Sequence, residues 1–136
     1  MIKVVYGNKG IGKTKYLIAD ANGMLKDCLG DVVFIDHDNS LITDLRHEIR
    51  YVNSSDFPIS TIYEMLAFIC GLIAEDYDIK AIYNDGLDKY ITNPGDINDF
   101  FEKLKIIADK FDVKFVFSVS GDISGIPDFV TKEYTC

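Results

Sequence analysis

The sequence predicts an α/β fold in which helices cover both faces of a mostly parallel sheet of four or five strands, in three layers. Two observations support this prediction. Short apolar runs alternate along the chain with longer stretches whose apolar residues recur every three or four positions. The first apolar run, residues 2–6, leads through a glycine-rich segment directly into such a stretch. Strands that alternate with helices are joined by crossovers, and they therefore run parallel.

The start of the chain contains two predicted strands with a helix between them. Val and Ile follow one another without polar alternation at residues 2–6 and 32–35, which indicates buried strands. The helix begins at Lys13 and ends near Gly30. Its apolar stripe consists of Leu17, Ile18, Ala21, Met24, Leu25 and Cys28.

The middle of the chain is less regular. Residues 40–57 are mixed in character, and we predict there a short helix and a short edge strand at residues 50–53. Thr61 and Glu64 then have the spacing of a capping box, which marks the start of a helix. We expect this helix to be buried on most sides, because its sequence is apolar around much of its circumference. One face consists of Ile62, Leu66, Ile69 and Ile73.

The remainder adds two strands and a further helix. Residues 81–84 and 114–119 are apolar runs of strand length. Asn93 and Pro94 begin a helix between them, with asparagine as the cap and proline in the first turn. The last fourteen residues form either a fifth strand or a tail that contacts a partner. The residues predicted for a subunit contact are Phe129, Val130 and Tyr134.

Composition and charge argue against two kinds of partner. The 136 residues carry a formal net charge of −8. Nucleic acids and anionic membranes favour clusters of Lys and Arg, so we expect neither as a partner. The longest apolar stretch, residues 65–74, is too short to cross a bilayer. We therefore expect a cytoplasmic protein that forms a single domain over residues 1–136. Reduced thiols fit its three widely spaced cysteines, Cys28, Cys70 and Cys136.

Residues 7–14, the glycine loop, read Gly-Asn-Lys-Gly-Ile-Gly-Lys-Thr, the pattern of a phosphate-binding loop between a strand and a helix. Its glycines permit positive φ angles and a close approach of the backbone to phosphate groups. Main-chain amides at the helix N-terminus can converge on a β-phosphate. Lys13 would bridge the β- and γ-phosphates, and the Thr14 hydroxyl would ligate Mg²⁺. The predicted nucleotide-binding residues are Gly7, Asn8, Lys9, Gly10, Ile11, Gly12, Lys13 and Thr14.

Asp85 is the second predicted site residue. It follows the apolar run at residues 81–84, and an acid in that place beside such a loop holds Mg²⁺ through water. Asp85 and Gly86 are also common turn formers, and that interpretation stays open. The predicted metal residues are thus Thr14 and Asp85. Because no N/T-K-x-D segment for reading guanine occurs, ATP is the favoured nucleotide.

In the glycine loop and Asp85, and in the order of its strands, the chain resembles the P-loop NTPase superfamily. The polar end of the run at residues 114–119 resembles the RecA-like branch, in which a polar side chain beside the loop strand senses the γ-phosphate. This resemblance implies that role for Ser118 or Ser120. More narrowly, the chain is similar to small single-domain ATP-binding proteins of clostridia-type bacteria, some labelled twitching-motility or pilus-retraction proteins. The resemblance implies a P-loop NTPase fold that binds ATP and Mg²⁺.

Two positions bear on catalysis. RecA-like ATPases usually have a glutamate directly after the magnesium aspartate, to activate water, and this chain has Gly86 there. Asp88 or Asp36 could replace it, because both are expected near the ligand edge of the sheet, although each is equally an ordinary loop acid. Lys9 could neutralise γ-phosphate charge in cis, or it is an exposed loop lysine. The predicted catalytic residues are Lys13, Asp85 and Asp88.

These features favour a slow Mg²⁺-dependent ATPase whose nucleotide state controls binding to another protein or to a second copy. The first alternative is a small-molecule kinase of the nucleoside type. Such an enzyme needs a lid that carries arginine, which residues 40–57 could provide with Arg46 and Arg50. The second alternative is a nucleotide-dependent scaffold that never hydrolyses. His37 and His47 lack partners at metal-ligand spacing and are expected at the surface.

Overall fold

A computed structural model describes residues 1–10, 12–27, 30–121 and 123–135 of the chain. This part of the chain contains the α-helices α1 (Gly12–Asp27), α2 (Ile62–Glu75) and α3 (Ile97–Phe111). None of its helices is both long enough and apolar enough to cross a membrane. The strands are β1 (Ile2–Gly7), β2 (Asp31–Asp36), β3 (Arg50–Asn53), β4 (Ile79–Asn84), β5 (Lys114–Ser120) and β6 (Thr131–Tyr134). Three short 3-10 turns are η1 (Ser54–Asp56), η2 (Leu87–Tyr90) and η3 (Pro94–Asp96).

The strands form one sheet in the order β3-β2-β4-β5-β1-β6, and every neighbouring pair runs parallel. The prediction of a parallel sheet is confirmed. The predicted number of four or five strands is wrong, since the sheet has 6 strands. β5 lies between β1 and β4, so the carboxyl ends of these three parallel strands lie side by side. The line of carboxyl ends is the carboxyl edge of the sheet. The register pairs Gly7 with Ser120 at that edge.

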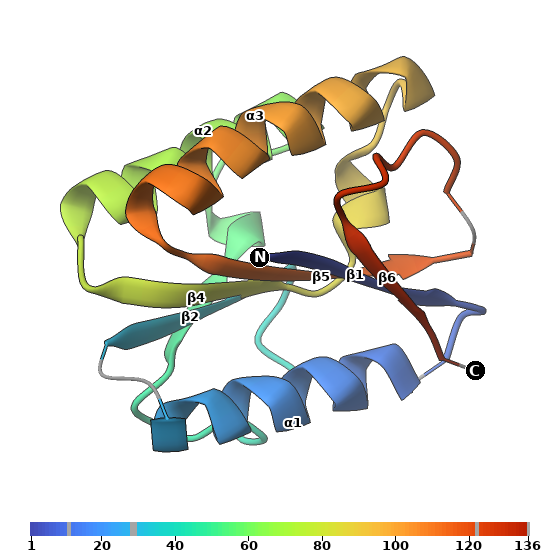
Figure 1. The fold of residues 1–136 in the computed structure, drawn as a ribbon. Coiled ribbons are helices and arrows are strands. Elements are labelled where there is room, and N and C mark those ends of the chain that lie inside the picture. The colour runs from blue at the N-terminus through green and yellow to red at the C-terminus, as the bar shows by residue number, and fades with distance from the viewer. Residues whose placement is uncertain (11, 28–29, 122, 136) are drawn as a thin grey trace.

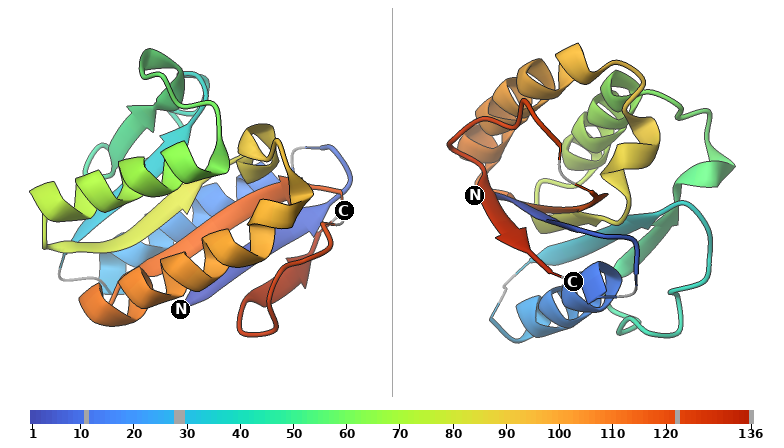
Figure 2. Two further views of the ribbon diagram at one scale, coloured as in Figure 1. Left: turned by 90° about the horizontal axis from the view of Figure 1, so that it is seen from above. Right: turned by 90° about the vertical axis from the view of Figure 1, so that its right-hand side faces the viewer.

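Helices cover both faces of the sheet, as predicted. Figure 1 shows α1 on one face and α2 with α3 on the other, and in Figure 2 α2 and α3 lie side by side above the sheet. Apolar side chains of the sheet pack against both layers. The larger cluster, on the side of α2 and α3, includes Met65, Ile69, Phe100, Phe101 and Phe117, and the smaller one, beneath α1, includes Val5, Leu17, Ala21, Phe34 and Tyr83.

The capping box that begins α2 is confirmed. The Thr61 Oγ1 accepts a hydrogen bond from the Glu64 backbone N at 3.1 Å, and the Glu64 carboxylate accepts one from the Thr61 backbone N at 3.0 Å. The expectation that α2 is buried on most sides is wrong. Its buried residues form one line, because a single face of the helix meets the sheet and α3. That line consists of Ile62, Met65, Ile69 and Ile73.

Two other predicted helices begin or end differently from the sequence pattern. The edge strand at residues 50–53 is confirmed as β3, but the helix expected within residues 40–57 is only the three-residue turn η1, among other turns. The Asn93 side chain accepts a hydrogen bond from the Gly95 backbone N at 3.0 Å, as a cap does. It begins the 3-10 turn η3, however, and the α-helix itself starts at Ile97.

The C-terminal segment forms a strand. β6 pairs with β1 in parallel, and Tyr134 lies opposite Tyr6 with the two ring centroids 5.5 Å apart. Val130 is 3% exposed and packs into the larger apolar cluster of the chain itself. The predicted role of Val130 in a subunit contact is therefore wrong. Phe129 and Tyr134 remain exposed.

Candidate functional site

The glycine loop connects β1 to α1 at the carboxyl edge of the sheet. The segments that follow β5 and β6, the two neighbours of β1 in the sheet, contact Gly7, the last residue of β1. The Gly7 carbonyl accepts a hydrogen bond from the Gly121 N at 2.5 Å, and a Cβ on Gly7 would collide with the Thr135 carbonyl. Gly7 also has a φ of 150°, so glycine is required here for two reasons.

Gly10 differs from Gly7 in its backbone conformation and surroundings. Gly10 does not have a positive φ, so that part of the prediction is wrong. A Cβ on Gly10 would meet no described atom within 4 Å, and the residue borders open space. Gly12 begins α1. Asn8 and Lys9 are exposed. Ile11 lies outside the described residues, and its predicted contact with nucleotide stays a prediction.

Lys13 is the most unusual residue of the loop. It is 5% exposed, and its ammonium donates hydrogen bonds to the Gly7 carbonyl at 3.3 Å and to the Asn8 carbonyl. It forms no ion pair with any described carboxylate. The first turn of α1 holds no acidic residue either, so the helix itself supplies no negative charge to its positive end. A buried ammonium without a counter-ion is costly, and an anion placed at this point would relieve that cost.

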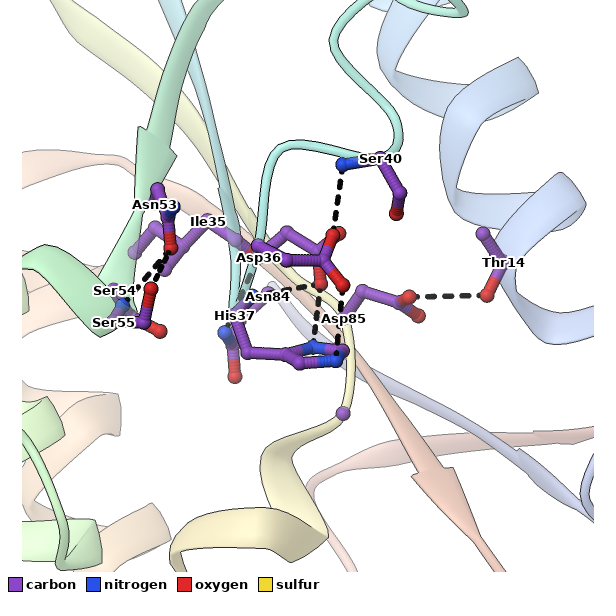
Figure 3. Close-up of polar contacts among 12 residues, drawn as sticks. Thr14, Ile35, Asp36, His37, Ser40, Asn53, Ser54, Ser55, Asn84 and Asp85 are labelled. Atoms are coloured by element: carbon purple, nitrogen blue, oxygen red, sulfur yellow. Dashed lines mark hydrogen bonds and ion pairs between the residues drawn. The ribbon is translucent and has the colours of Figure 1, made fainter.

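Thr14 and Asp85, 71 positions apart in sequence, meet at this edge. The Thr14 hydroxyl donates to Asp85 Oδ2 at 3.0 Å, as Figure 3 shows. The other carboxylate oxygen, Oδ1, accepts a hydrogen bond from the Ser118 hydroxyl at 2.5 Å. The same hydroxyl accepts one from the Gly86 N at 2.7 Å. Asp85 is thus linked to both β5 and α1, which brings together the two predicted metal residues.

Ser118 and Ser120 differ in what they contact. Ser118 is 2% exposed and bonds directly to Asp85 through its side chain. Ser120 uses its backbone N, which donates to Asp88 Oδ1 at 3.1 Å. Both residues line the same cavity, but only Ser118 contacts an acidic residue through its side chain among the hydrogen bonds of the described chain. The Asp88 carboxylate thus holds the end of β5, and its predicted catalytic role stays a prediction.

Asp36 ends β2 beside Asp85 and is 1% exposed. Its Oδ2 accepts a hydrogen bond from the Tyr51 hydroxyl at 3.0 Å, and its Oδ1 accepts one from the His37 backbone N at 2.8 Å. Burial raises the pKa of the Asp36 carboxyl, and the negative charge of Asp85 adds to this rise, while the two hydrogen bonds oppose it. Asp36 is therefore a better proton acceptor than an ordinary aspartate once it is ionised.

The partners of Asp36 could not be identified from local sequence. Tyr51 lies on β3 opposite Phe34 of β2, and this pairing carries its hydroxyl to Asp36. Burial is the main cause that raises the pKa of Tyr51, and the charge of Asp36 and the hydrogen bond to it add to the rise. His37 is exposed, as expected, with Nδ1 2.9 Å from Asp36 Oδ1 and Nε2 3.4 Å from Asp38 Oδ2. The edge-strand pattern of residues 50–53 was the only local signal for this arrangement.

These residues surround one cavity of about 560 Å³, within the size range of small-molecule sites. The glycine loop, the start of α1 and the ends of β2, β4 and β5 all contribute to it. Its charged lining combines three ammonium groups with several carboxylates. The charged residues are Lys9, Lys13, Lys89, Asp36, Asp85 and Asp88.

No protein-family model matches the chain, and no curated protein is similar enough to be a relative. What the site does must therefore be argued from its geometry.

Proposed function

We propose that this cavity binds ATP with Mg²⁺, and that the chain is a slow ATPase whose nucleotide state controls its association with another protein or a second copy. The observation that carries the proposal is the buried ammonium of Lys13, which has only backbone carbonyls as partners among the described residues. It lies at the N-terminus of a 16-residue helix, where backbone N–H groups favour an anion. A polyphosphate tail supplies the missing negative charge.

The residues around Lys13 fit Mg²⁺ as well. Thr14 and Asp85 offer a hydroxyl oxygen and a carboxylate oxygen 3.0 Å apart, which are hard ligands of the kind Mg²⁺ prefers. The described residues contain no cluster of three or more acidic, His or Cys side chains able to hold a metal alone. Such a site suits an ion that completes its shell with phosphate oxygens and water. When bound, Mg²⁺ neutralises part of the phosphate charge.

Asp36 is the best-placed proton acceptor for hydrolysis. In that step the oxygen of a water molecule bonds to the γ-phosphorus, and the bond to the bridging oxygen breaks with its electron pair leaving on ADP. The proton of the attacking water passes to the Asp36 carboxylate. Asp36 is preferred to Asp88, because it is buried and its pKa is raised by burial and by the charge of Asp85. We expect slow turnover, since two hydrogen bonds already occupy Asp36.

The kinase alternative receives no support from the arginines. Arg46 is exposed and lies 3.7 Å from Glu48, and Arg50 lies at the start of β3, at the opposite end of that strand from the cavity. A lid that closes over phosphates would need these guanidinium groups at the carboxyl ends of the strands, where the cavity lies.

Nucleotide titration of the purified chain tests the proposal. Mg·ATP should raise the melting temperature and bind measurably in calorimetry, with Mg·GTP as the comparison for base preference. Lys13→Ala should weaken binding by roughly a hundredfold. The matched control is Lys110→Ala, because Lys110 is an exposed lysine at the far end of α3. A chain that binds no triphosphate at millimolar concentration contradicts the proposal, and ATP binding without phosphate release favours the scaffold.

A further inference from the structure

Lys89 lines the candidate cavity from an element other than the glycine loop. It belongs to η2, which follows Asp85 and Gly86, and Gly86 turns the chain with a φ of 85°. The Lys89 side chain folds back over this turn, and its Nζ lies 2.6 Å from the position that a Cβ on Gly86 would occupy. The absence of a side chain at Gly86 thus makes room for the ammonium beside Asp85. Lys89 lines the same cavity as Lys13.

The turn that presents Lys89 is firmly held. Leu87 and Tyr90 are buried, and the Tyr90 hydroxyl shares a hydrogen bond with the Ser54 hydroxyl. The Gly86 N donates to Ser118, as described above, and the Lys89 N donates to the Gly86 carbonyl at 3.1 Å. The base of the side chain is therefore fixed before any ligand arrives, which lowers the entropy cost of using it.

Like Lys13, and unlike the ion-paired lysines of the chain, Lys89 has no ionic partner among the described residues. Lys114, Lys103 and Lys105 each lie within 2.8 Å of an aspartate oxygen. For Lys89, no hydrogen bond or ion pair of the ammonium to a described residue is present, although acidic residues surround it. The positive charge of Lys89 slightly lowers the pKa of Asp38, although hydrogen bonds from Ser40 are the main cause of that lowering. The ammonium thus belongs to a residue that lines the cavity, and no described ion pair has to be broken for it to bind a ligand.

We propose that Lys89 binds the terminal phosphate of ATP and makes the site prefer ATP over ADP. This inference rests on the proposed function and names the group that distinguishes the two nucleotides. Lys13 contacts the phosphates from the start of α1, and Lys89 contacts the last of them from η2. A switch needs such a group, since a ligand shifts a protein between states only through contacts that differ between them.

The experiment measures affinities for ADP and for a non-hydrolysable ATP analogue, both with Mg²⁺, by calorimetry. Wild type should prefer the triphosphate. Lys89→Ala should weaken triphosphate binding by roughly tenfold and leave ADP binding nearly unchanged, since the variant loses a hydrogen bond between charged groups that only the triphosphate makes. Lys89→Arg should retain the preference. Lys13→Ala should weaken both nucleotides, and the control Lys110→Ala neither.

The outcomes separate this inference from the function on which it rests. If the wild type binds neither nucleotide, the proposed function fails and Lys89 loses its role with it. If the wild type binds and Lys89→Ala keeps its preference for triphosphate, or loses both nucleotides equally, the role of Lys89 alone is overturned. Thermal unfolding of each variant without ligand checks the fold, which the exposed Lys89 side chain should not affect.

Discussion

Two cavities of nearly equal size lie at opposite ends of the sheet, and they differ in where their charges lie. The candidate site measures about 560 Å³ and the second cavity, between α2 and the edge formed by β2 and β3, about 540 Å³. In the candidate site Lys13 and Asp36 are buried. In the second cavity the charged residues lie mostly on an exposed rim around an apolar floor, which includes Val32, Val33, Phe68, Leu72 and Ile79.

The comparison shows that the two cavities differ in their buried polar groups and not in their volume. The buried polar or charged side chains of the described chain all belong to the glycine loop or to the carboxyl ends of strands: Lys13, Asp36, Ser54, Asn84 and Ser118. Asn84 is fully buried, and its Oδ1 has no hydrogen-bond partner among the described residues. Each such group is costly to bury, and their concentration at one edge supports the proposal that a ligand binds there.

The largest expected effect comes from Asp36→Asn at the carboxyl end of β2. ATP hydrolysis should fall by about a hundredfold or more, because the proton acceptor is lost, while ATP binding is retained. Phosphate release and calorimetry measure the two quantities separately. Unchanged hydrolysis in this variant would show that Asp36 is not the proton acceptor.

The same variant tests the raised pKa of Asp36. A carboxyl whose pKa is higher in the folded than in the unfolded chain stabilises the fold below its ordinary pKa of about 4, and this contribution is lost as the pH rises through the raised value. Wild type should therefore lose stability relative to Asp36→Asn as the pH rises above about 4. Denaturation across this range measures the difference, and a constant difference would contradict the assignment.

A smaller effect is expected from Phe68→Ala in the second cavity. Phe68 is partly buried and packs against Phe57 with ring centroids 5.3 Å apart. Its truncation should lower the free energy of unfolding by about 1–3 kcal/mol, by loss of apolar contact. ATP affinity should not change. A variant that instead lost nucleotide binding would mean that the two cavities are coupled.

The smallest effect is expected from Asp31→Asn, the matched control for Asp36→Asn. Both aspartates belong to β2, Asp31 at its start and Asp36 at its end, and both have a raised pKa. For Asp31 the main cause is the contact with Asp76, and the side chain is exposed. Its replacement should change the free energy of unfolding by less than about 0.5 kcal/mol and leave hydrolysis intact. A loss of hydrolysis as large as that of Asp36→Asn would mean that the two ends of β2 do not differ in their importance for hydrolysis.

Much of the fold was predictable, because its signals are local. Apolar runs located β1, β2, β4 and β5 to within two residues, and the Thr61–Glu64 spacing located the start of α2. The prediction for α2 failed on its burial. Its sequence is apolar on several sides, but which side is covered depends on where the sheet and α3 lie.

The candidate site was predictable in part. The glycine loop and Asp85 were recognisable, since each follows an apolar strand. The sequence did not distinguish Ser118 from Ser120, because residues two positions apart on a strand lie on the same face. It did not distinguish Asp36 from Asp88 either, because their hydrogen-bond partners come from other elements of the fold. Lys89 gave no signal, since its position depends on the turn at Gly86.

By itself, the sequence determined the type of most elements, the phosphate-loop pattern and the acidic ends of the strands. These follow from contacts between near neighbours along the chain. The tertiary structure decided which of these residues meet. Strand order brings Thr14 to Asp85, Tyr51 to Asp36 and Ser118 to Asp85, across separations of 71, 15 and 33 positions. No local sequence pattern predicts these contacts, because they depend on the pairing of all the strands and on which face of the sheet each helix covers.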